Sequence, residues 1–178
     1  MRVAIAVLVG LLGTCINLVE CRAASIAEIK AGIDGAYILE EWHTDAGVFR
    51  PPQVEGRVVF LNGAVVTILI DKMREERQVT VAEFGIYELR EGSFSYRYDN
   101  ASTFTQTTNT ITVSHTLPRE GMRDFDVTQE GATVRLRSKS AEQAEFIINA
   151  EGFKYSIGGK LLRVWRRSNW NKERSGPR

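Results

Sequence analysis

The chain has very few of the side chains that perform metal or nucleophilic chemistry. Its 178 residues include two cysteines, Cys15 and Cys21, and two histidines, His43 and His115. Both cysteines fall in a segment that a secretory signal peptidase would remove, so we expect a mature chain without a disulfide or a cysteine nucleophile. No glycine-rich phosphate loop, zinc-type spacing or serine nucleophile elbow occurs. The sequence therefore predicts no cofactor and no bound metal.

Long apolar runs are also missing. The most apolar segment is residues 3–12, and the basic Arg2 precedes it. Further along, residues 21–23 place small side chains where a signal peptidase requires them, so that cleavage would follow Ala23. It is shorter than the roughly 20 residues that span a bilayer. We predict a signal peptide in residues 1–23, a secreted or periplasmic protein and no stable membrane insertion. A retained anchor, or lipidation at one of the two cysteines, is the weaker alternative.

The chain also has almost no net charge. Removing the predicted signal leaves 21 basic and 21 acidic residues, so the expected mature chain is neutral. Basic residues gather at the end, in residues 163–178. Such an end can contact nucleic acid or anionic lipid, but no basic patch with interleaved aromatics occurs elsewhere. We interpret residues 168–178 as a solvated basic tail and expect no nucleic-acid partner.

The clearest structural pattern is a turn between two β-branched runs. Residues 57–61 and 64–71 flank Asn62 and Gly63, a pair that suits a type I′ turn because both central positions need positive φ. An isolated hairpin is only marginally stable in water. Further strands must therefore cover its apolar face.

Such strands are predicted at short, even intervals along the rest of the chain. They are residues 36–44, 78–90, 93–98, 110–117, 122–128, 133–138, 144–149, 153–157 and 160–166. Residues 47–53 are expected to form a loop and residues 99–109 a loop or weak edge, while Gly85 suggests a bulge.

A short helix is predicted before the first strand. Ser25 is a plausible N-cap, and Ile26, Ile29 and Ile33 follow at helical spacing. The fold class is therefore all-β, with residues 24–167 forming an antiparallel up-and-down β-barrel of about 8–10 strands behind a short N-terminal helix.

Several local motifs occur in a suggestive order. They are Gly35-Ala36-Tyr37, a polar loop with Pro51-Pro52, the 56–71 hairpin, residues 84–89 and the closing Leu162-Arg163-Val164-Trp165. This order resembles the lipocalin-like (calycin) barrels, which implies a barrel mouth that receives a small apolar ligand. That family opens on Gly-x-Trp, and Tyr37 stands at the Trp position here. The resemblance also implies a basic residue over that ring, for which Arg163 is the best match.

The predicted ligand site follows from strand alternation and from the resemblance. The sets Phe94/Tyr96/Tyr98, Ile111/Val113/His115 and Arg123/Phe125/Val127 each share one strand face. If these faces point inward, they line an apolar cavity in which Arg123 can fix a carboxylate or carbonyl; otherwise the aromatic residues fill the core. The candidate ligand-binding residues are Tyr37, Glu41, His43, Phe94, Tyr96, Tyr98, His115, Arg123 and Phe125.

Three functions are consistent with this sequence. The leading hypothesis is an extracytoplasmic protein that binds a small hydrophobic ligand without catalysis. A second is a calycin-type isomerase or cyclase in which His115, Tyr96 or Glu41 moves a proton. Glu41 and His43 could also form a metal site with His115. A third is a module whose outer face or basic tail binds a protein or the cell envelope.

Overall fold

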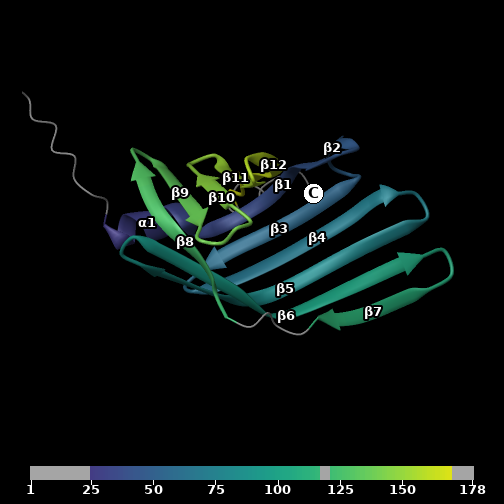
Figure 1. Ribbon diagram of the computed structural model, residues 1–178. Helices are drawn as coiled ribbons and strands as arrows, with labels where there is room; N and C mark the ends of the chain where they lie inside the picture. Colours follow the sequence, from purple (N-terminus) through teal and green to yellow (C-terminus); the bar gives the residue numbers. More distant parts are fainter. Residues whose placement is uncertain (1–24, 117–120, 170–178) are drawn as a thin grey trace, which may run out of the picture.

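The computed structural model describes residues 25–116 and 121–169, which form a single antiparallel sheet closed into a barrel (Figure 1). The predicted signal in residues 1–23 lies outside the described residues. So does the predicted basic tail, apart from Ser168 and Asn169.

Within the described residues the chain forms one helix and twelve strands. Their bounds are α1 (Ile26–Ile33), β1 (Gly35–Thr44), β2 (Gly47–Phe49), β3 (Val54–Leu61), β4 (Ala64–Arg74), β5 (Arg77–Arg90), β6 (Ser93–Thr107), β7 (Ile111–Thr116), β8 (Arg123–Glu130), β9 (Thr133–Ser138), β10 (Ala144–Ile148), β11 (Gly152–Ile157) and β12 (Lys160–Arg167). No helix in this part of the chain is both long and apolar enough to cross a membrane.

Ten of the strands form the barrel wall. Their order is β1, β3, β4, β5, β6, β8, β9, β10, β11 and β12, and β12 pairs back with β1. This closure pairs the first and last strands of the wall, which would otherwise be exposed edges. The predicted all-β barrel with a short N-terminal helix is confirmed.

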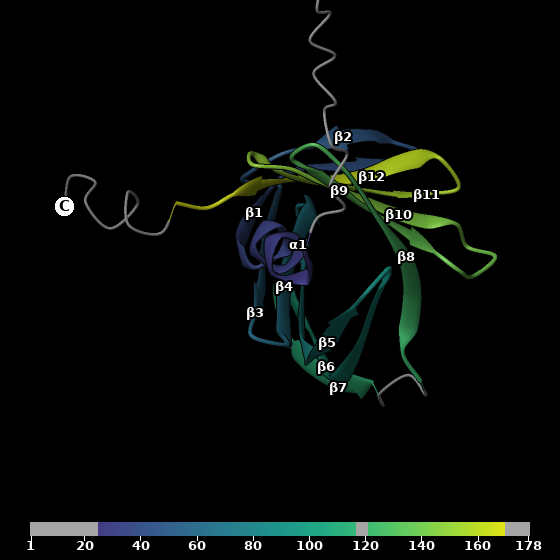
Figure 2. The same ribbon diagram turned by 90° about the vertical axis from the view of Figure 1, so that its left-hand side faces the viewer.

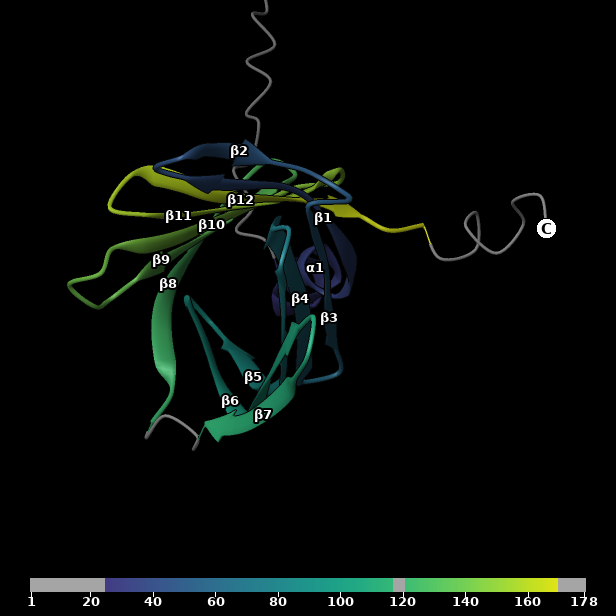
Figure 3. The same ribbon diagram turned by 90° about the vertical axis from the view of Figure 1, so that its right-hand side faces the viewer.

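Two short strands stand outside the wall. β2 pairs with β1 and β7 pairs with β6, both at the end of the molecule that faces the viewer in Figure 3. The helix α1 lies at the opposite end, which faces the viewer in Figure 2. The two ends of the barrel are therefore different in construction.

The predicted hairpin joins β3 and β4 as expected. Asn62 and Gly63 both have positive φ, 51° and 86°, and Leu61 pairs with Ala64 directly beside them. Burial alternates along β3, so that Val58 and Phe60 face the core while Arg57 and Leu61 face solvent. The turn thus sets which face of both strands is buried.

Three expectations about loops are corrected by the structure. Residues 99–107, expected as a loop or weak edge, continue β6, because β5 and β7 supply backbone partners on either side. Gly47–Phe49, expected within a loop, forms β2 against β1. Residues 72–77, which lie between the predicted strands 64–71 and 78–90, are mostly strand, since β4 reaches Arg74 and β5 begins at Arg77.

The predicted bulge at Gly85 is present. The register between β5 and β6 shifts between Phe84 and Gly85. A Cβ at position 85 would lie 1.9 Å from the carbonyl oxygen of Arg97 and 2.7 Å from Cα of Tyr98. Only glycine therefore allows the two backbones to approach this closely.

The helix is capped and anchored as the sequence predicts. The Ser25 hydroxyl accepts a hydrogen bond from the backbone N–H of Glu28, and the Glu28 carboxylate accepts one from the N–H of Ser25, which completes a capping box. Ile29 and Ile33 are buried in the barrel, whereas Ile26 is exposed. One face of α1 thus covers the end of the core.

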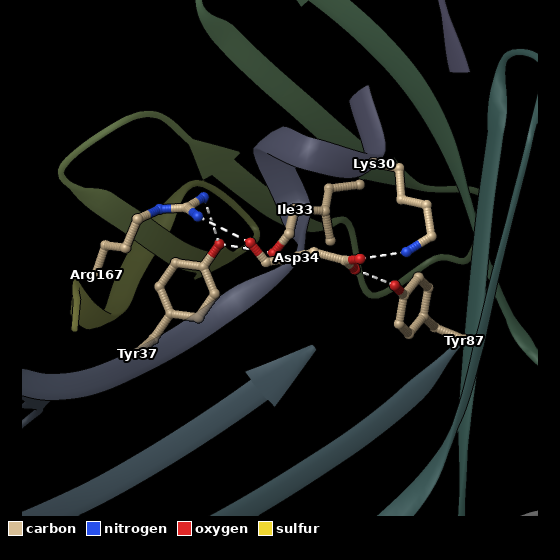
Figure 4. Close-up of polar contacts among 6 residues, drawn as sticks. All are labelled: Lys30, Ile33, Asp34, Tyr37, Tyr87 and Arg167. Atoms are coloured by element: carbon tan, nitrogen blue, oxygen red, sulfur yellow. Dashed lines mark hydrogen bonds and ion pairs between the residues drawn. The ribbon is translucent and has the colours of Figure 1, made fainter. Parts of the chain in front are cut away.

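Arg167 fixes the last turn of this helix to the end of β12 (Figure 4). Its guanidinium donates to the carbonyl oxygen of Asp34 at 2.8 Å, to that of Gly32, and to the Tyr37 hydroxyl at 2.8 Å. The Tyr37 hydroxyl in turn donates to the carbonyl oxygen of Ile33 at 2.7 Å, and burial raises the pKa of Tyr37 to about 12. The helix carbonyls that lack partners within the helix are satisfied in this way.

The basic residue over Tyr37 is therefore Arg167, and the expectation that it is Arg163 is wrong. The Arg167 guanidinium lies 5.0 Å from the centre of the Tyr37 ring, because the pairing of β1 with β12 places these two residues opposite each other. On the other side of the turn, the Asp34 carboxylate accepts hydrogen bonds from Tyr87 and Lys30 (Figure 4).

We predict that Arg167→Lys lowers the free energy of unfolding by at least about 2 kcal/mol. Lysine cannot reproduce the forked set of donors, and each lost bond to a charged group costs about 1.5–3 kcal/mol. Urea denaturation measures the change. Arg166→Lys is the matched control, since Arg166 pairs with Glu40 at the surface and its change should stay within about 0.5 kcal/mol. Equal effects of the two substitutions would contradict the prediction.

We predict that Gly85→Ala destabilises the barrel by about 2 kcal/mol or more, because the new Cβ forces β5 away from β6. Gly32→Ala is the control. Its Cβ would meet Val134 at an ordinary distance of 3.4 Å, and alanine favours the helix by about 0.5–1 kcal/mol. Thermal denaturation of both variants should move the midpoint down for the first and not for the second.

Candidate functional site

Aromatic rings pack the half of the barrel next to α1. Phe94 and Phe125 are each only 1% exposed, with their ring centres 6.1 Å apart, and Phe94 also stacks on Tyr87 at 5.7 Å. Phe60 contacts both Tyr37 and Tyr87 edge to face. This part of the interior is a filled core.

A cavity of about 300 Å³, partly open to solvent, lies inside the barrel beyond these rings. It is on the side away from α1, since Trp42 lines it while Tyr37, earlier on β1, contacts the helix. Its walls come from nearly all barrel strands. The lining residues are Trp42, Val58, Phe60, Thr67, Leu69, Val81, Glu83, Tyr96, Tyr98, Arg123, Phe146, Phe153, Tyr155, Arg163 and Trp165.

Two hydrogen bonds order part of this lining. The hydroxyls of Thr67 and Tyr98 lie 2.7 Å apart, and Thr67 is buried. Arg123 donates to the Tyr96 hydroxyl at 3.0 Å and lies 5.6 Å from the centre of the Tyr96 ring. Burial raises the pKa values of Tyr96 and Tyr98, so both hydroxyls keep their protons at neutral pH.

A carboxyl and a guanidinium are half-buried in the same cavity. Burial raises the pKa of Glu83, although Arg123 and Arg163 oppose the change, and burial lowers the pKa of Arg163. The Arg163 guanidinium lies 4.5 Å from the centre of the Trp42 ring. Within the described residues neither Glu83 nor Arg163 forms a hydrogen bond or an ion pair, and the Nε of Arg163 is buried without a partner.

The structure separates the nine candidate residues into three groups of three. The first group lines the cavity and consists of Tyr96, Tyr98 and Arg123. The second group belongs to the buried core and consists of Tyr37, Phe94 and Phe125. The third group lies outside the cavity and consists of Glu41, His43 and His115.

Glu41 and His43 lie together on the outer face of β1. They flank Trp42, which points into the cavity, so strand alternation turns them outward. The Glu41 carboxylate contacts Nε2 of His43 at 2.8 Å and accepts a bond from Arg50 at 2.5 Å, which holds the pKa of Glu41 below its usual value. This is a surface ion-pair cluster.

His115 lies on β7, away from Glu41 and His43. The condition that Ile111, Val113 and His115 face inward is not met, because β7 is exposed along its whole length and, among the described strands, pairs with β6 alone. His115 contacts the Ser102 hydroxyl at 2.9 Å. Among residues 25–116 and 121–169, no group of three or more His, Cys, Asp or Glu side chains is placed to hold a metal ion.

Glu83, Arg163 and Trp42 line the cavity but are not among the nine candidate ligand-binding residues. A signal for two of them exists in the strand patterns. Glu83 alternates with Val81 and Tyr87 on the inward face of β5, and Arg163 alternates with Trp165 on that of β12. A charged residue that alternates with apolar residues on an inward strand face therefore indicates a polar group in the interior.

No protein-family model, no curated protein and no solved structure matches the chain. The site is accordingly defined by its own residues and their geometry.

We predict that Glu83→Gln stabilises the protein at neutral pH and not in acid. In the folded protein the carboxyl keeps its proton to higher pH than in the unfolded chain, where its pKa is about 4.5. Wild-type stability therefore falls as the pH rises through this window, and glutamine removes that loss. Urea denaturation at pH 4 and pH 8 measures the difference.

Glu88→Gln is the control for this measurement. Glu88 lies on the same strand but is exposed and pairs with Arg90, so its replacement should change stability by no more than about 0.5 kcal/mol at either pH. A gain for Glu83→Gln of the same size at pH 4 and pH 8 would show that burial of this charge does not control stability.

Proposed function

We propose that this protein binds a small, largely apolar molecule inside the barrel and does so outside the cytoplasm, as a lipocalin-like protein. The observation that carries the proposal is the aromatic-walled cavity of about 300 Å³ in a barrel whose other half is filled. Ligand pockets usually measure about 300–1,000 Å³ and combine apolar walls with a few convergent polar groups. A ligand at the small end of that range fits these walls.

Two further features support the lipocalin-like assignment. A short helix closes one end of the barrel, and an arginine of the last strand lies over the aromatic residue near the start of the first. That pair is Arg167 and Tyr37. The location outside the cytoplasm rests on the signal-like sequence of residues 1–23. The proposal includes neither a nucleic-acid partner nor stable membrane insertion.

Tryptophan fluorescence provides the test, because Trp42 and Trp165 both line the cavity. We expect saturable quenching when an apolar probe such as N-phenyl-1-naphthylamine is added. Val81→Phe should weaken probe binding at least tenfold, since the larger ring occupies the cavity. Ile68→Phe is the matched control, because Ile68 is exposed on the outer face of neighbouring β4, and it should leave binding unchanged.

Two results would contradict the proposal. One is the absence of saturable binding for any apolar probe to a folded wild-type protein. The other is equal loss of binding in the two variants, which would place the probe outside the barrel.

Catalysis in the same cavity is the second candidate, and Glu83 favours it. A half-buried carboxyl with a raised pKa, lining the same cavity as Tyr96 and Tyr98, keeps its proton to higher pH than a free carboxyl and can donate it to a bound molecule. An isomerase or cyclase would need such a group. Mass spectrometry and chromatography of a bound ligand before and after incubation distinguish the two functions, because a binding protein returns the ligand unchanged.

A further inference from the structure

We infer that the cavity ligand carries a single negative charge, as an amphipathic carboxylate does, and that the Arg163 guanidinium binds this head group. The inference rests on the proposed function and specifies its ligand class. It follows from the state of Arg163, from the charges that line the cavity and from the side chains beside it.

Arg163 is a half-buried cation whose guanidinium forms no hydrogen bond or ion pair among the described residues, although the Glu83 carboxyl lines the same cavity and its charge acts on Arg163 without direct contact. Its closest interaction is with the Trp42 ring, and its Nε is buried without an acceptor. A buried charge is costly unless it is paired and hydrogen-bonded. Arg163 therefore has donors that an anion entering the cavity would satisfy.

Arg167, on the same face of β12, provides a comparison because its guanidinium has hydrogen-bond acceptors. It also has a buried Nε without a partner, but its two terminal nitrogens bind two carbonyl oxygens and the Tyr37 hydroxyl. Arg163 has no counterpart to these acceptors within the described residues. The two arginines differ because Arg167 faces the helix end and Arg163 faces the cavity.

The charges around the cavity favour a monoanion. Three ionisable charged side chains line it, namely Arg123, Arg163 and Glu83, so the lining has an excess of one positive charge when all three are ionised. A ligand with one negative charge makes the site neutral, whereas a dianion reverses the excess. Arg123 is already bonded to Tyr96 and is exposed, which leaves Arg163 as the deeper binding group.

The neighbours of Arg163 hold the guanidinium in place for this role. Arg163 pairs across the sheet with Trp42 on β1 and with Tyr155 on β11, so the three inward side chains form a row. The guanidinium carbon lies 4.5 Å from the centre of the Trp42 ring, and this cation–π contact holds the guanidinium at the cavity wall. A planar guanidinium held in this position can donate two parallel hydrogen bonds to a carboxylate.

The apolar part of the ligand would lie against the aromatic wall that continues from this row. Phe153 stacks on Trp165 with ring centres 5.5 Å apart, and Phe146 packs beside Tyr155 at 4.8 Å. These rings line the same cavity and connect it to the filled core. Arg163 can thus bind the charged head group while the aromatic wall contacts the hydrocarbon part of the ligand.

Titration calorimetry with decanoate and 1-decanol tests the inference, because the two probes share a chain and differ in charge. We expect the wild-type protein to bind decanoate at least tenfold more tightly than decanol. Arg163→Met should abolish this preference while changing decanol affinity less than threefold. Arg166→Met, on the outer face of the same strand, is the control and should keep the preference.

The outcomes separate this inference from the proposed function. Equal wild-type affinity for both probes, or persistence of the preference in folded Arg163→Met, overturns the inference and leaves apolar binding intact. Binding of neither probe overturns the proposed function and the inference together. The wild-type comparison decides the charge preference even if the Arg163 variant fails to fold.

Discussion

The pairing of β1 with β12 is the contact on which the rest of the structure depends. It closes the sheet, removes two exposed edges and places Arg167 over Tyr37. The same pairing brings Arg163 against Trp42. The register between β1 and β12 therefore determines both the contact of Arg167 with Tyr37 at the helix end and the position of Arg163 in the cavity. A shift of this register by one residue would disrupt both contacts.

The inward faces of the barrel strands have different roles at the two ends of the barrel. Near α1 the inward side chains are rings that fill the barrel, and further along they are rings that leave a space with polar groups at its border. Core packing at one end gives the walls of the other end a fixed position. The cavity is thus shaped by residues that do not touch it, among them Phe94 and Phe125.

Local patterns in the sequence are sufficient to predict the barrel, but they do not predict which residues form the site. Asn62 and Gly63 specify their turn through their own φ preferences, and alternation specifies which residues of a strand are buried. Which arginine faces Tyr37 depends on register between the two ends of the chain, including the bulge between Leu39 and Glu41, and no local pattern encodes it. His115 could not be placed either, since alternation defines faces without showing what covers them.

The hydrogen bonds of Arg167 to Gly32, Asp34 and Tyr37 also bear on the order of folding. Its partners Tyr37 and Gly32 are separated from it by 130 and 135 residues, so the bond can form only when the two ends of the barrel domain meet. Until then β1 has β3 as a neighbour and an open edge on its other side. Contacts this distant in sequence slow folding and leave edges exposed to other chains. Closure of the barrel consequently depends on a contact that is among the most distant in the sequence.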